Sequence, residues 1–132
     1  MSKPLIILAS ASPRRRELLH QIGIPHDVIP ADIIEEPTPD EAPIAYVQRI
    51  AAEKSLEILK LGNVDLPVLA ADTEVVLDNV VLGKPRDADH ARSLLTQLSG
   101  REHQVLSAVS LRVGQQHWFA MSTSTVRFRV LT

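Results

Sequence analysis

Residues 5–16 have the sequence LIILASASPRRR, and this stretch decides the expected fold. Leu5–Leu8 is a short continuous apolar run, typical of a strand buried on both faces. Ser12 suits a helix N-cap and Pro13 the first helical position, and Gly23 is placed to end that helix. The helix would carry an apolar stripe formed by Leu18, Leu19 and Ile22. The sequence therefore predicts a strand, a tight loop and a helix in direct succession.

Apolar periodicity and turn residues divide the remainder of the chain into further helices and strands. One helix is expected over about residues 44–61, closed by Gly62-Asn63, and Asp87 is expected to cap another. Asp78-Asn79 suits a two-residue hairpin turn. The expected strands are 67–71, 75–77, 80–82, 103–113 and 116–130. We therefore expect a single domain over residues 1–132, an α/β fold with a mixed twisted sheet and flanking helices.

Composition restricts the class of protein. The chain has 132 residues and 45% apolar content, enough for one domain with a core but hardly for two. The formal net charge is -2 and charges of both signs are interspersed, which argues against a nucleic-acid-binding protein. With no cysteine, neither a disulfide framework nor a thiol nucleophile is available. The N-terminal apolar run is too short for a signal peptide or a membrane span, so we expect a cytoplasmic protein that binds a small ligand and no membrane.

Three consecutive arginines, Arg14–Arg16, occupy the first turn of the first expected helix. Cations are unfavourable there, because the helix dipole and the unpaired N–H groups already make that end positive. A bound phosphate would offset this by meeting N–H groups, serine hydroxyls and guanidinium groups at one point. The alternative is a solvated basic turn that pairs with nearby acids. Because Ser10 and Ser12 directly precede the arginines, we favour the anion site.

A second candidate cluster combines a carboxylate with two lysines. Asp72 follows the strand expected over 67–71, and open α/β sheets bind ligands beyond the carboxyl ends of their strands. There it could hold a divalent cation or deprotonate a water, although an Asx turn that merely ends the strand is the alternative. Lys54 lies on the apolar stripe of the helix over 44–61, so it either extends past its neighbours to solvent or points into a negatively charged site. Lys84, in a loop of restricted shape, is the other candidate.

Several short motifs occur in the order and approximate spacing of the Maf family. They are LASASPRR at Leu8–Arg15 with Leu18-Leu19, Arg49 with Glu53-Lys54, Ala71-Asp72-Thr73, Gly83-Lys84-Pro85, Ser99-Gly100 and His103-x-Val105. The chain thus resembles the Maf family over essentially its whole length. The resemblance implies a fold similar to that of inosine triphosphatase. It also implies cleavage of a nucleoside triphosphate between the α and β phosphates, with a divalent cation, magnesium or manganese, as the cofactor.

The same resemblance implies roles for individual residues. Asp72 would accept the proton of the attacking water, and Arg14 and Thr73 would help to select the substrate. Glu35 would hold the metal together with Asp72, with Glu36 as the alternative ligand. The phosphates would be bound by Ser10, Arg15, Lys54 and Lys84.

Two further features of the resemblance concern the identity of the substrate and the C-terminal extent of the domain. Ala71-Asp72-Thr73 is similar to the branch of the family that acts on dTTP and UTP, which implies a pyrimidine nucleoside triphosphate as the substrate. Family members usually continue beyond the strand that here ends near Thr132, into a segment with an Ala-Gly-x-Tyr-x-x-Gln motif, so the domain is expected to be C-terminally incomplete. Two functions stay open, a pyrophosphatase and a non-catalytic nucleotide-binding module without hydrolysis. The family also suggests a homodimer.

Overall fold

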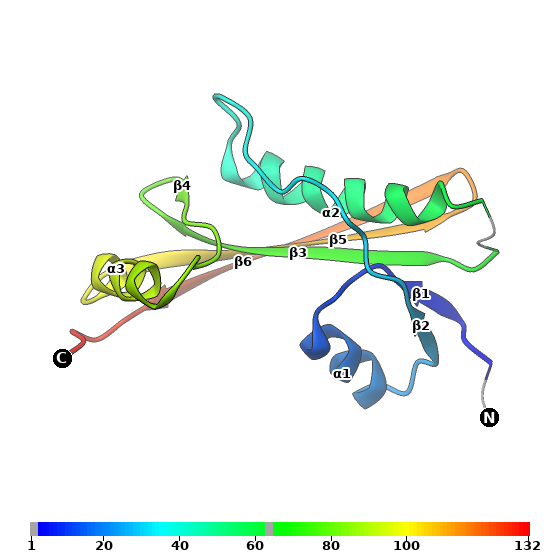
Figure 1. The fold of residues 1–132 in the computed structure, drawn as a ribbon, viewed down its shortest axis with the longest axis horizontal. Helices are drawn as coiled ribbons and strands as arrows, with labels where there is room; N and C mark the ends of the chain where they lie inside the picture. The colour runs from blue at the N-terminus through cyan, green and yellow to red at the C-terminus, as the bar shows by residue number, and fades with distance from the viewer. Residues whose placement is uncertain (1–2, 63–64) are drawn as a thin grey trace.

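The computed structural model describes residues 3–62 and 65–132, which form one six-stranded mixed sheet with three helices (Figure 1). The strand order is β2-β1-β3-β5-β6, and β4 pairs with β3. The strands are β1 (Ile6–Leu8), β2 (His26–Val28), β3 (Val68–Leu77), β4 (Val80–Val81), β5 (Glu102–Val113) and β6 (Gln116–Arg127). The helices are α1 (Pro13–Gln21), α2 (Pro43–Leu59) and α3 (Ala88–Leu98). The expected α/β fold with a mixed sheet and flanking helices is confirmed.

Local sequence accounts for the opening unit of β1 and α1. Ser12 is the N-cap of α1, and its hydroxyl accepts a hydrogen bond from the N–H of Arg15 at 3.4 Å. The helix begins at Pro13 as expected, and Gly23 turns the chain with a φ of 73°. Of the expected apolar stripe, only Leu19 is buried. β1 pairs in parallel with both β2 and β3 and is therefore an interior strand.

The third strand, β3, differs from the expectation. It continues from Val68 to Leu77, so the prediction that Asp72 follows the end of a strand is wrong. Asp72 and Glu74 lie within β3 on its buried face, and these polar residues interrupt the apolar pattern without interrupting the strand. The strand continues because β5 runs antiparallel beside it past this point. β1, in contrast, ends at Leu8. A crevice beyond the carboxyl end of a strand was expected beside Asp72, but in this sheet it lies beyond the end of β1 and not of β3.

Several turns and caps were predictable from short sequence signals. Asp78 and Asn79 adopt left-handed φ angles of 51° and 65°, and β4 folds back on β3, so the hairpin is confirmed. The carboxylate of Asp87 caps α3 by accepting from the N–H of His90 at 2.7 Å. The helix expected over 44–61 is α2; of its expected closing pair, Asn63 lies outside the described residues.

The last strand is shorter than expected. β6 ends at Arg127 and not at residue 130, so the predicted C-terminal bound is wrong. Its partner β5 begins at Glu102, directly opposite Arg127, and the ladder therefore stops there. Two backbone hydrogen bonds continue beyond it, from Phe128 to Arg101 and from Gly100 to Arg129.

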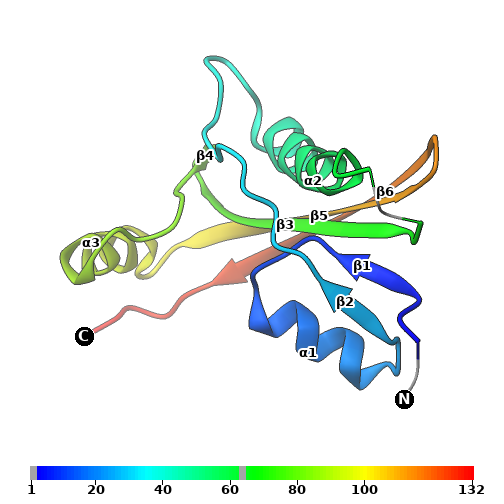
Figure 2. The same ribbon diagram turned by 45° about the vertical axis from the view of Figure 1, so that its right-hand side comes forward.

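The helices α1 and α2 lie on opposite sides of the sheet, as Figures 1 and 2 show. α2 covers one face of β3 and β5, and this packing forms the larger part of the core. Its buried members are Tyr46, Val47, Ile50, Ala51, Val76, Leu106 and Ala108. The side chains of Asp72 and Glu74 belong to the same buried face, so α2 also covers the acidic part of β3.

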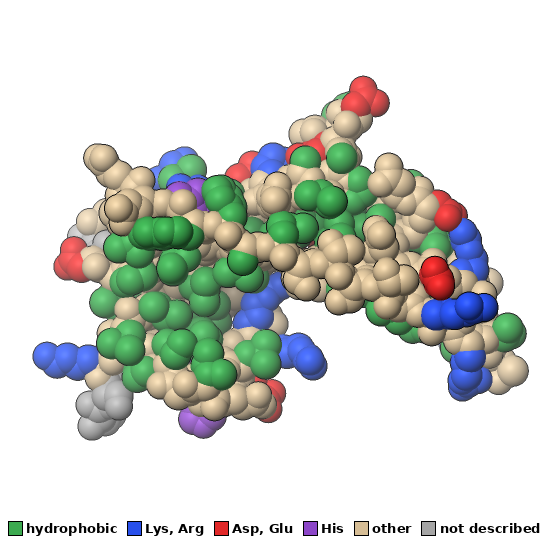
Figure 3. Space-filling model, turned by 180° about the vertical axis from the view of Figure 1, so that it is seen from behind, with side chains coloured by type: hydrophobic (Ala, Val, Ile, Leu, Met, Phe, Trp, Pro, Cys, Tyr) green, Lys and Arg blue, Asp and Glu red, His purple; other side chains and the backbone are tan. Residues whose placement is uncertain are grey.

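Apolar side chains are also found at the surface. Figure 3 shows them gathered in a broad patch on the back of the molecule. The exposed large apolar residues include Leu18, Ile22 and Trp118. In the part of the chain that the structure describes, no helix has both the length and the apolar character needed to cross a bilayer.

Candidate functional site

The loop between β1 and α1 forms one wall of a cavity of about 240 Å³. Ser10 is buried in this loop, where its Oγ accepts hydrogen bonds from the N–H of Ser12 at 3.0 Å and from Nη1 of Arg15 at 3.3 Å. The cavity is lined by Ala9, Ser10, Ala11, Ser12, Arg15, Ala31, Glu35, Lys54 and Lys84. The fold thus brings all four residues predicted to bind phosphate to one cavity.

Arg15 connects this loop to the sheet. Its Nη2 donates to Oγ1 of Thr73 at 3.4 Å, and the Thr73 hydroxyl lies 3.0 Å from the hydroxyl of Ser107 on β5. Thr73 follows Asp72 in the strand, so the two side chains point to opposite faces. The guanidinium therefore links the cavity to a pair of hydroxyl groups on the other face. Sequence reasoning missed Ser107, because only the pairing of β3 with β5 places it opposite Thr73.

Lys54 points into a negatively charged site and does not extend to solvent. Its side chain is buried on α2, and its Nζ lies 3.0 Å from Oε1 of Glu35 and 3.5 Å from Oδ1 of Asp72. It also donates to the carbonyl oxygen of Ala71 at 3.4 Å. Of the two alternatives for this lysine, the second is confirmed. Lys54 therefore joins the cavity, the loop that carries Glu35 and the acidic face of β3.

Glu74 is a member of this cluster that sequence reasoning missed. It is 7% exposed and lies two residues beyond Asp72, on the same face of β3. Burial, then the charge of Asp72 and a hydrogen bond to it, and then the charge of Glu35 raise the pKa of Glu74 to about 7, while Lys84 opposes the shift. Residues separated by one position lie on the same face of a strand. The spacing Asp72-x-Glu74 would therefore have indicated that Glu74 accompanies Asp72 only if the strand had been expected to continue beyond residue 71.

The region around the two carboxyls has a negative potential. Tyr46, buried on α2, has its pKa raised first by burial and then by the charges of Glu74, Asp72 and Glu35. Its phenol therefore stays protonated. A cation would be stabilised in these surroundings.

The carboxylates near the cavity have the oxygen chemistry that magnesium and manganese prefer. Oδ2 of Asp72 is buried and has no hydrogen-bond partner among the described residues, so this oxygen is available to a water or a cation. Within residues 3–62 and 65–132, no group of three or more His, Asp or Glu side chains is arranged to hold a metal ion. Magnesium often takes only one or two protein carboxylates, because waters and substrate phosphates supply its other ligands. The donor set therefore fits a divalent cation that binds together with a phosphate ligand.

The acidic loop, residues 32–42, is attached to α2 by one arginine. Arg49 donates from Nε to Oε2 of Glu41 at 2.7 Å and from Nη2 to Oε1 of the same carboxylate at 2.9 Å. It also donates to both carboxylate oxygens of Glu53, at 3.1 and 3.0 Å, and to the carbonyl oxygen of Glu36 at 2.9 Å. The guanidinium thereby fixes the residue next to Glu35. Arg49 belongs to one of the sequence motifs, but only the tertiary structure shows that its guanidinium binds the acidic loop.

Five candidate residues do not line the cavity. Asp72 and Thr73 reach it only through their contacts with the lining residues Lys54 and Arg15. Arg14 and Arg16 are exposed and do not line it. Glu36, the alternative to Glu35 as a metal ligand, instead lines a groove between the acidic loop and α2. The geometry therefore favours Arg15 among the three arginines and Glu35 over Glu36 as the acid that faces the cavity.

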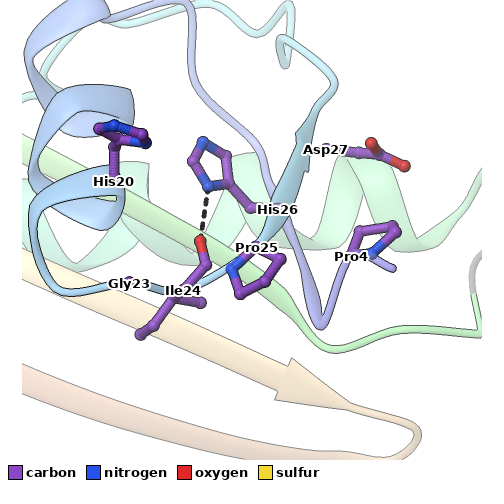
Figure 4. Close-up of a pocket in the computed structure, with 7 residues that line it drawn as sticks. All are labelled: Pro4, His20, Gly23, Ile24, Pro25, His26 and Asp27. Atoms are coloured by element: carbon purple, nitrogen blue, oxygen red, sulfur yellow. Dashed lines mark hydrogen bonds between the residues drawn. The ribbon is translucent and has the colours of Figure 1, made fainter. Parts of the chain in front are cut away.

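A different hollow, of about 450 Å³, lies between the end of α1 and β2 (Figure 4). His20 and His26 both line it, and Nδ1 of His26 donates to the carbonyl oxygen of Ile24 at 3.0 Å. None of the residues predicted to bind substrate or metal lines this hollow. It is therefore separate from the cavity at Ser10.

Comparison with protein families and curated proteins gives a consistent result. The family model described as Maf-like protein matches residues 5–132. A dTTP/UTP pyrophosphatase of Methylococcus capsulatus is 55% identical over 126 residues, a match that covers 96% of this chain and 62% of the relative. One of Nitrosomonas europaea is 51% identical, with 94% and 66% covered, and one of Yersinia pestis is 47% identical, with 96% and 64% covered. The chain thus spans 62% to 66% of the length of these relatives.

Solved structures show the same fold at low sequence identity. A nucleoside-triphosphatase / dITP/XTP pyrophosphatase of Mycobacterium abscessus superposes with a TM-score of 0.58 at 21% identity, over 91% of this chain and 72% of that one. The Ham1 protein of Staphylococcus aureus gives 0.57 at 14% identity, with 91% and 69% covered. At these identities the likeness concerns the fold alone.

Proposed function

Because the chain belongs to the family of Maf-like proteins, we propose that it hydrolyses dTTP or UTP to the nucleoside monophosphate and pyrophosphate. The observation that carries this proposal is the cavity in which Ser10, Arg15, Lys54 and Lys84 surround one space, with Lys54 in contact with Asp72. The names of relatives that are 47% to 55% identical support the choice of substrate.

The cavity suits the phosphates of the substrate. Arg15 offers a planar set of donors, and two ammonium groups, of Lys54 and Lys84, supply positive charge from the other walls. The N–H groups at the start of α1 add the positive end of the helix dipole. With a net charge of only -2 for the whole chain, this local cluster and not the overall field would attract the anion.

The proposed general base is Asp72. Its buried Oδ2 has a free lone pair, while Oδ1 is held by Lys54 at 3.5 Å. Oδ2 takes a proton from a water as the water oxygen forms a bond to the α phosphorus. The anhydride bond between the α and β phosphates breaks, and the electron pair leaves with pyrophosphate. Arg15 and Lys84 stabilise the charge that develops on the phosphate oxygens.

A divalent cation, magnesium or manganese, bound to Asp72 and a second carboxylate would neutralise negative charge on the phosphates. The resemblance to the family assigns the second carboxylate to Glu35. Thr73, through its contact with Arg15, is proposed to help select the nucleotide, and so is Arg14, which is exposed beside the cavity loop.

The proposal is tested by measuring nucleotide binding and pyrophosphate release side by side. The chain should release pyrophosphate from dTTP and UTP in the presence of magnesium or manganese. Asp72→Asn should lower turnover by more than about 100-fold, the scale of a lost general base, and should still bind dTTP. The exposed Glu57→Gln variant serves as the control.

Each outcome leads to a different conclusion. Binding of dTTP by the unaltered chain without pyrophosphate release would support the nucleotide-binding module in place of the enzyme. Turnover of the Asp72→Asn variant close to that of the unaltered chain would show that another group is the base.

A further inference from the structure

Two hydroxyl groups form a pair on the face of the sheet that α2 does not cover. Thr73 on β3 lies directly opposite Ser107 on β5, and their hydroxyl oxygens are 3.0 Å apart. The two neighbours of Ser107 in the strand, Leu106 and Ala108, belong to the core under α2, so the side chain of Ser107 projects to the other face. Thr73 is exposed and Ser107 is half-buried, so a ligand can reach both hydroxyls from solvent.

Arg15 gives the hydrogen bonds of this pair a direction. The helix that carries it, α1, lies on the same side of the sheet as the pair (Figure 2). Nη2 of Arg15 donates to Oγ1 of Thr73 at 3.4 Å, and a guanidinium can only donate. A hydrogen bond accepted from a cation polarises the Thr73 hydroxyl and favours its donation to Ser107, because successive hydrogen bonds strengthen one another. The hydroxyl hydrogen of Ser107 then ends the series and is available to a ligand, since the hydrogen bonds of the described residues give Ser107 no other partner.

The side chains beside the pair are uncharged. On the same face of the sheet, Val75 lies opposite Val105 on one side of the pair, and Ala71 lies opposite Val109 on the other. Sites for small molecules commonly combine apolar walls with a few oriented polar groups. The ring of a nucleobase can lie against such side chains and accept a hydrogen bond at its edge, whereas a phosphate is better served by the cations of the cavity at Ser10.

We propose that Ser107 is a specificity-determining residue, whose hydroxyl donates to a carbonyl oxygen of the substrate's base while Thr73 and Arg15 orient that donor. This inference rests on the proposed function, since it names a group that recognises the base of the same substrate. Thymine and uracil carry a carbonyl acceptor at the ring position where cytosine carries an amino donor. A hydroxyl that is held as a donor therefore favours dTTP and UTP over dCTP, because the cytosine amino group would face it with a second donor.

The test is calorimetry with three ligands that are not turned over or have no base. They are the α,β-methylene analogues of dTTP and dCTP, in which the bond between the α and β phosphorus atoms is not hydrolysed, and inorganic triphosphate. Ser107→Ala should weaken binding of the dTTP analogue about fivefold, the effect of one lost hydrogen bond. Binding of the dCTP analogue and of inorganic triphosphate should change less than about twofold. Ser107→Thr, which keeps the hydroxyl, should restore most of the affinity for the dTTP analogue.

Ser124→Ala is the matched control. It removes an exposed hydroxyl from the same face of the sheet, opposite Val105, and should change the affinity for each ligand less than about twofold. Thermal melting of the variants separates loss of recognition from loss of folding. A purely structural role of Ser107 would weaken binding of all three ligands together, whereas recognition of the base affects the dTTP analogue alone.

Several results would overturn the proposal. They are equal losses of the two nucleotide analogues, a matching loss of inorganic triphosphate, unchanged binding of the dTTP analogue by Ser107→Ala, a Ser107→Thr variant as weak as Ser107→Ala, or no binding of the dTTP analogue by the unaltered chain. Pyrophosphate release from dTTP is measured separately. Release by the unaltered chain with an unchanged preference in Ser107→Ala would refute this inference alone. A preference that depends on Ser107, without release, would refute the proposed function alone.

Discussion

Nε of Arg49 lies 2.7 Å from Oε2 of Glu41, and this contact joins α2 to the acidic loop. The pair is only part of the attachment, because the same guanidinium also reaches Glu53 and the carbonyl oxygen of Glu36. The loop carries Glu35 to the cavity, where it meets Lys54. One arginine outside the cavity therefore controls how one wall of the cavity is placed.

Replacing Arg49 should loosen the acidic loop and reduce stability. Arg49→Ala removes several hydrogen bonds to charged groups at once, so we expect a loss of about 1–2 kcal/mol in the free energy of unfolding, measured with urea. Proteolytic cleavage within residues 32–42 should become faster. Arg101→Ala is the control, since it breaks the exposed pair of Arg101 with Asp78 at 2.6 Å and should cost less than about 0.5 kcal/mol. Equal effects of the two variants would contradict the role assigned to Arg49.

The same contact makes stability depend on pH in the acidic range. Hydrogen bonding to Arg49, and then to the N–H of Thr38, lowers the pKa of Glu41 to about 2 from an ordinary value of 4.5. The stabilisation is therefore complete above pH 4.5 and is lost as the pH falls towards 2. Urea unfolding at pH 6 and pH 3 should show a smaller difference for Glu41→Gln and for Arg49→Ala than for the unaltered chain. A difference of the same size in all three would show that this carboxylate does not titrate as stated.

Arg15 and Arg16 are adjacent in sequence but should differ in effect. Arg15 contacts Ser10 and Thr73 and lines the cavity, whereas Arg16 is exposed. We expect Arg15→Ala to weaken dTTP binding at least about tenfold in calorimetry, because a charge-assisted contact to phosphate is worth roughly 1.5–3 kcal/mol. Arg15→Lys should restore little, since one ammonium cannot replace the planar set of donors. Arg16→Ala should stay within about twofold; a comparable loss there would favour a general basic turn over a defined anion site.

A buried hydroxyl network should contribute to stability and not to activity. Ser110 on β5 lies 2.7 Å from the hydroxyl of Ser55 on α2 and 2.6 Å from Nε2 of His117 on β6, and Arg112 donates to Ser55 at 2.8 Å. Ser110→Ala would leave buried polar partners unsatisfied and should cost about 1–3 kcal/mol. Ser93→Ala, at an exposed position of α3, is the control. A large fall in turnover of the folded Ser110→Ala variant would contradict the purely structural role.

Local sequence signals were sufficient for the parts of the fold that depend on neighbouring residues. Ser12 and Pro13 predicted the start of α1, and Asp78-Asn79 predicted the hairpin, because caps and tight turns are decided by a few adjacent residues. The orientation of Lys54 could be narrowed to two alternatives from the helical period. Choosing between them required the position of Glu35 and Asp72 in space.

The errors concern residues whose partners are distant in sequence. The sequence predicts that this strand stops at residue 71 because the polar pair Asp72-Thr73 follows, and it gives no sign that Glu74 lies on the same buried face as Asp72. Likewise, β6 was expected to reach residue 130, although its pairing ends where β5 begins. In both cases the length of a strand depends on its neighbour, which local patterns do not contain.

By itself the sequence determined that a basic loop after the first strand starts a helix, and that the chain forms an α/β sheet with flanking helices. Its motifs also singled out four residues that line one cavity. These features follow from local caps, periodicity and motifs. Only the tertiary structure decided that Asp72 lies inside a strand, that Glu74 shares its buried face, and that Arg49 holds the loop carrying Glu35. The physical reason is that burial, strand pairing and charge compensation are set by contacts between segments far apart in the chain.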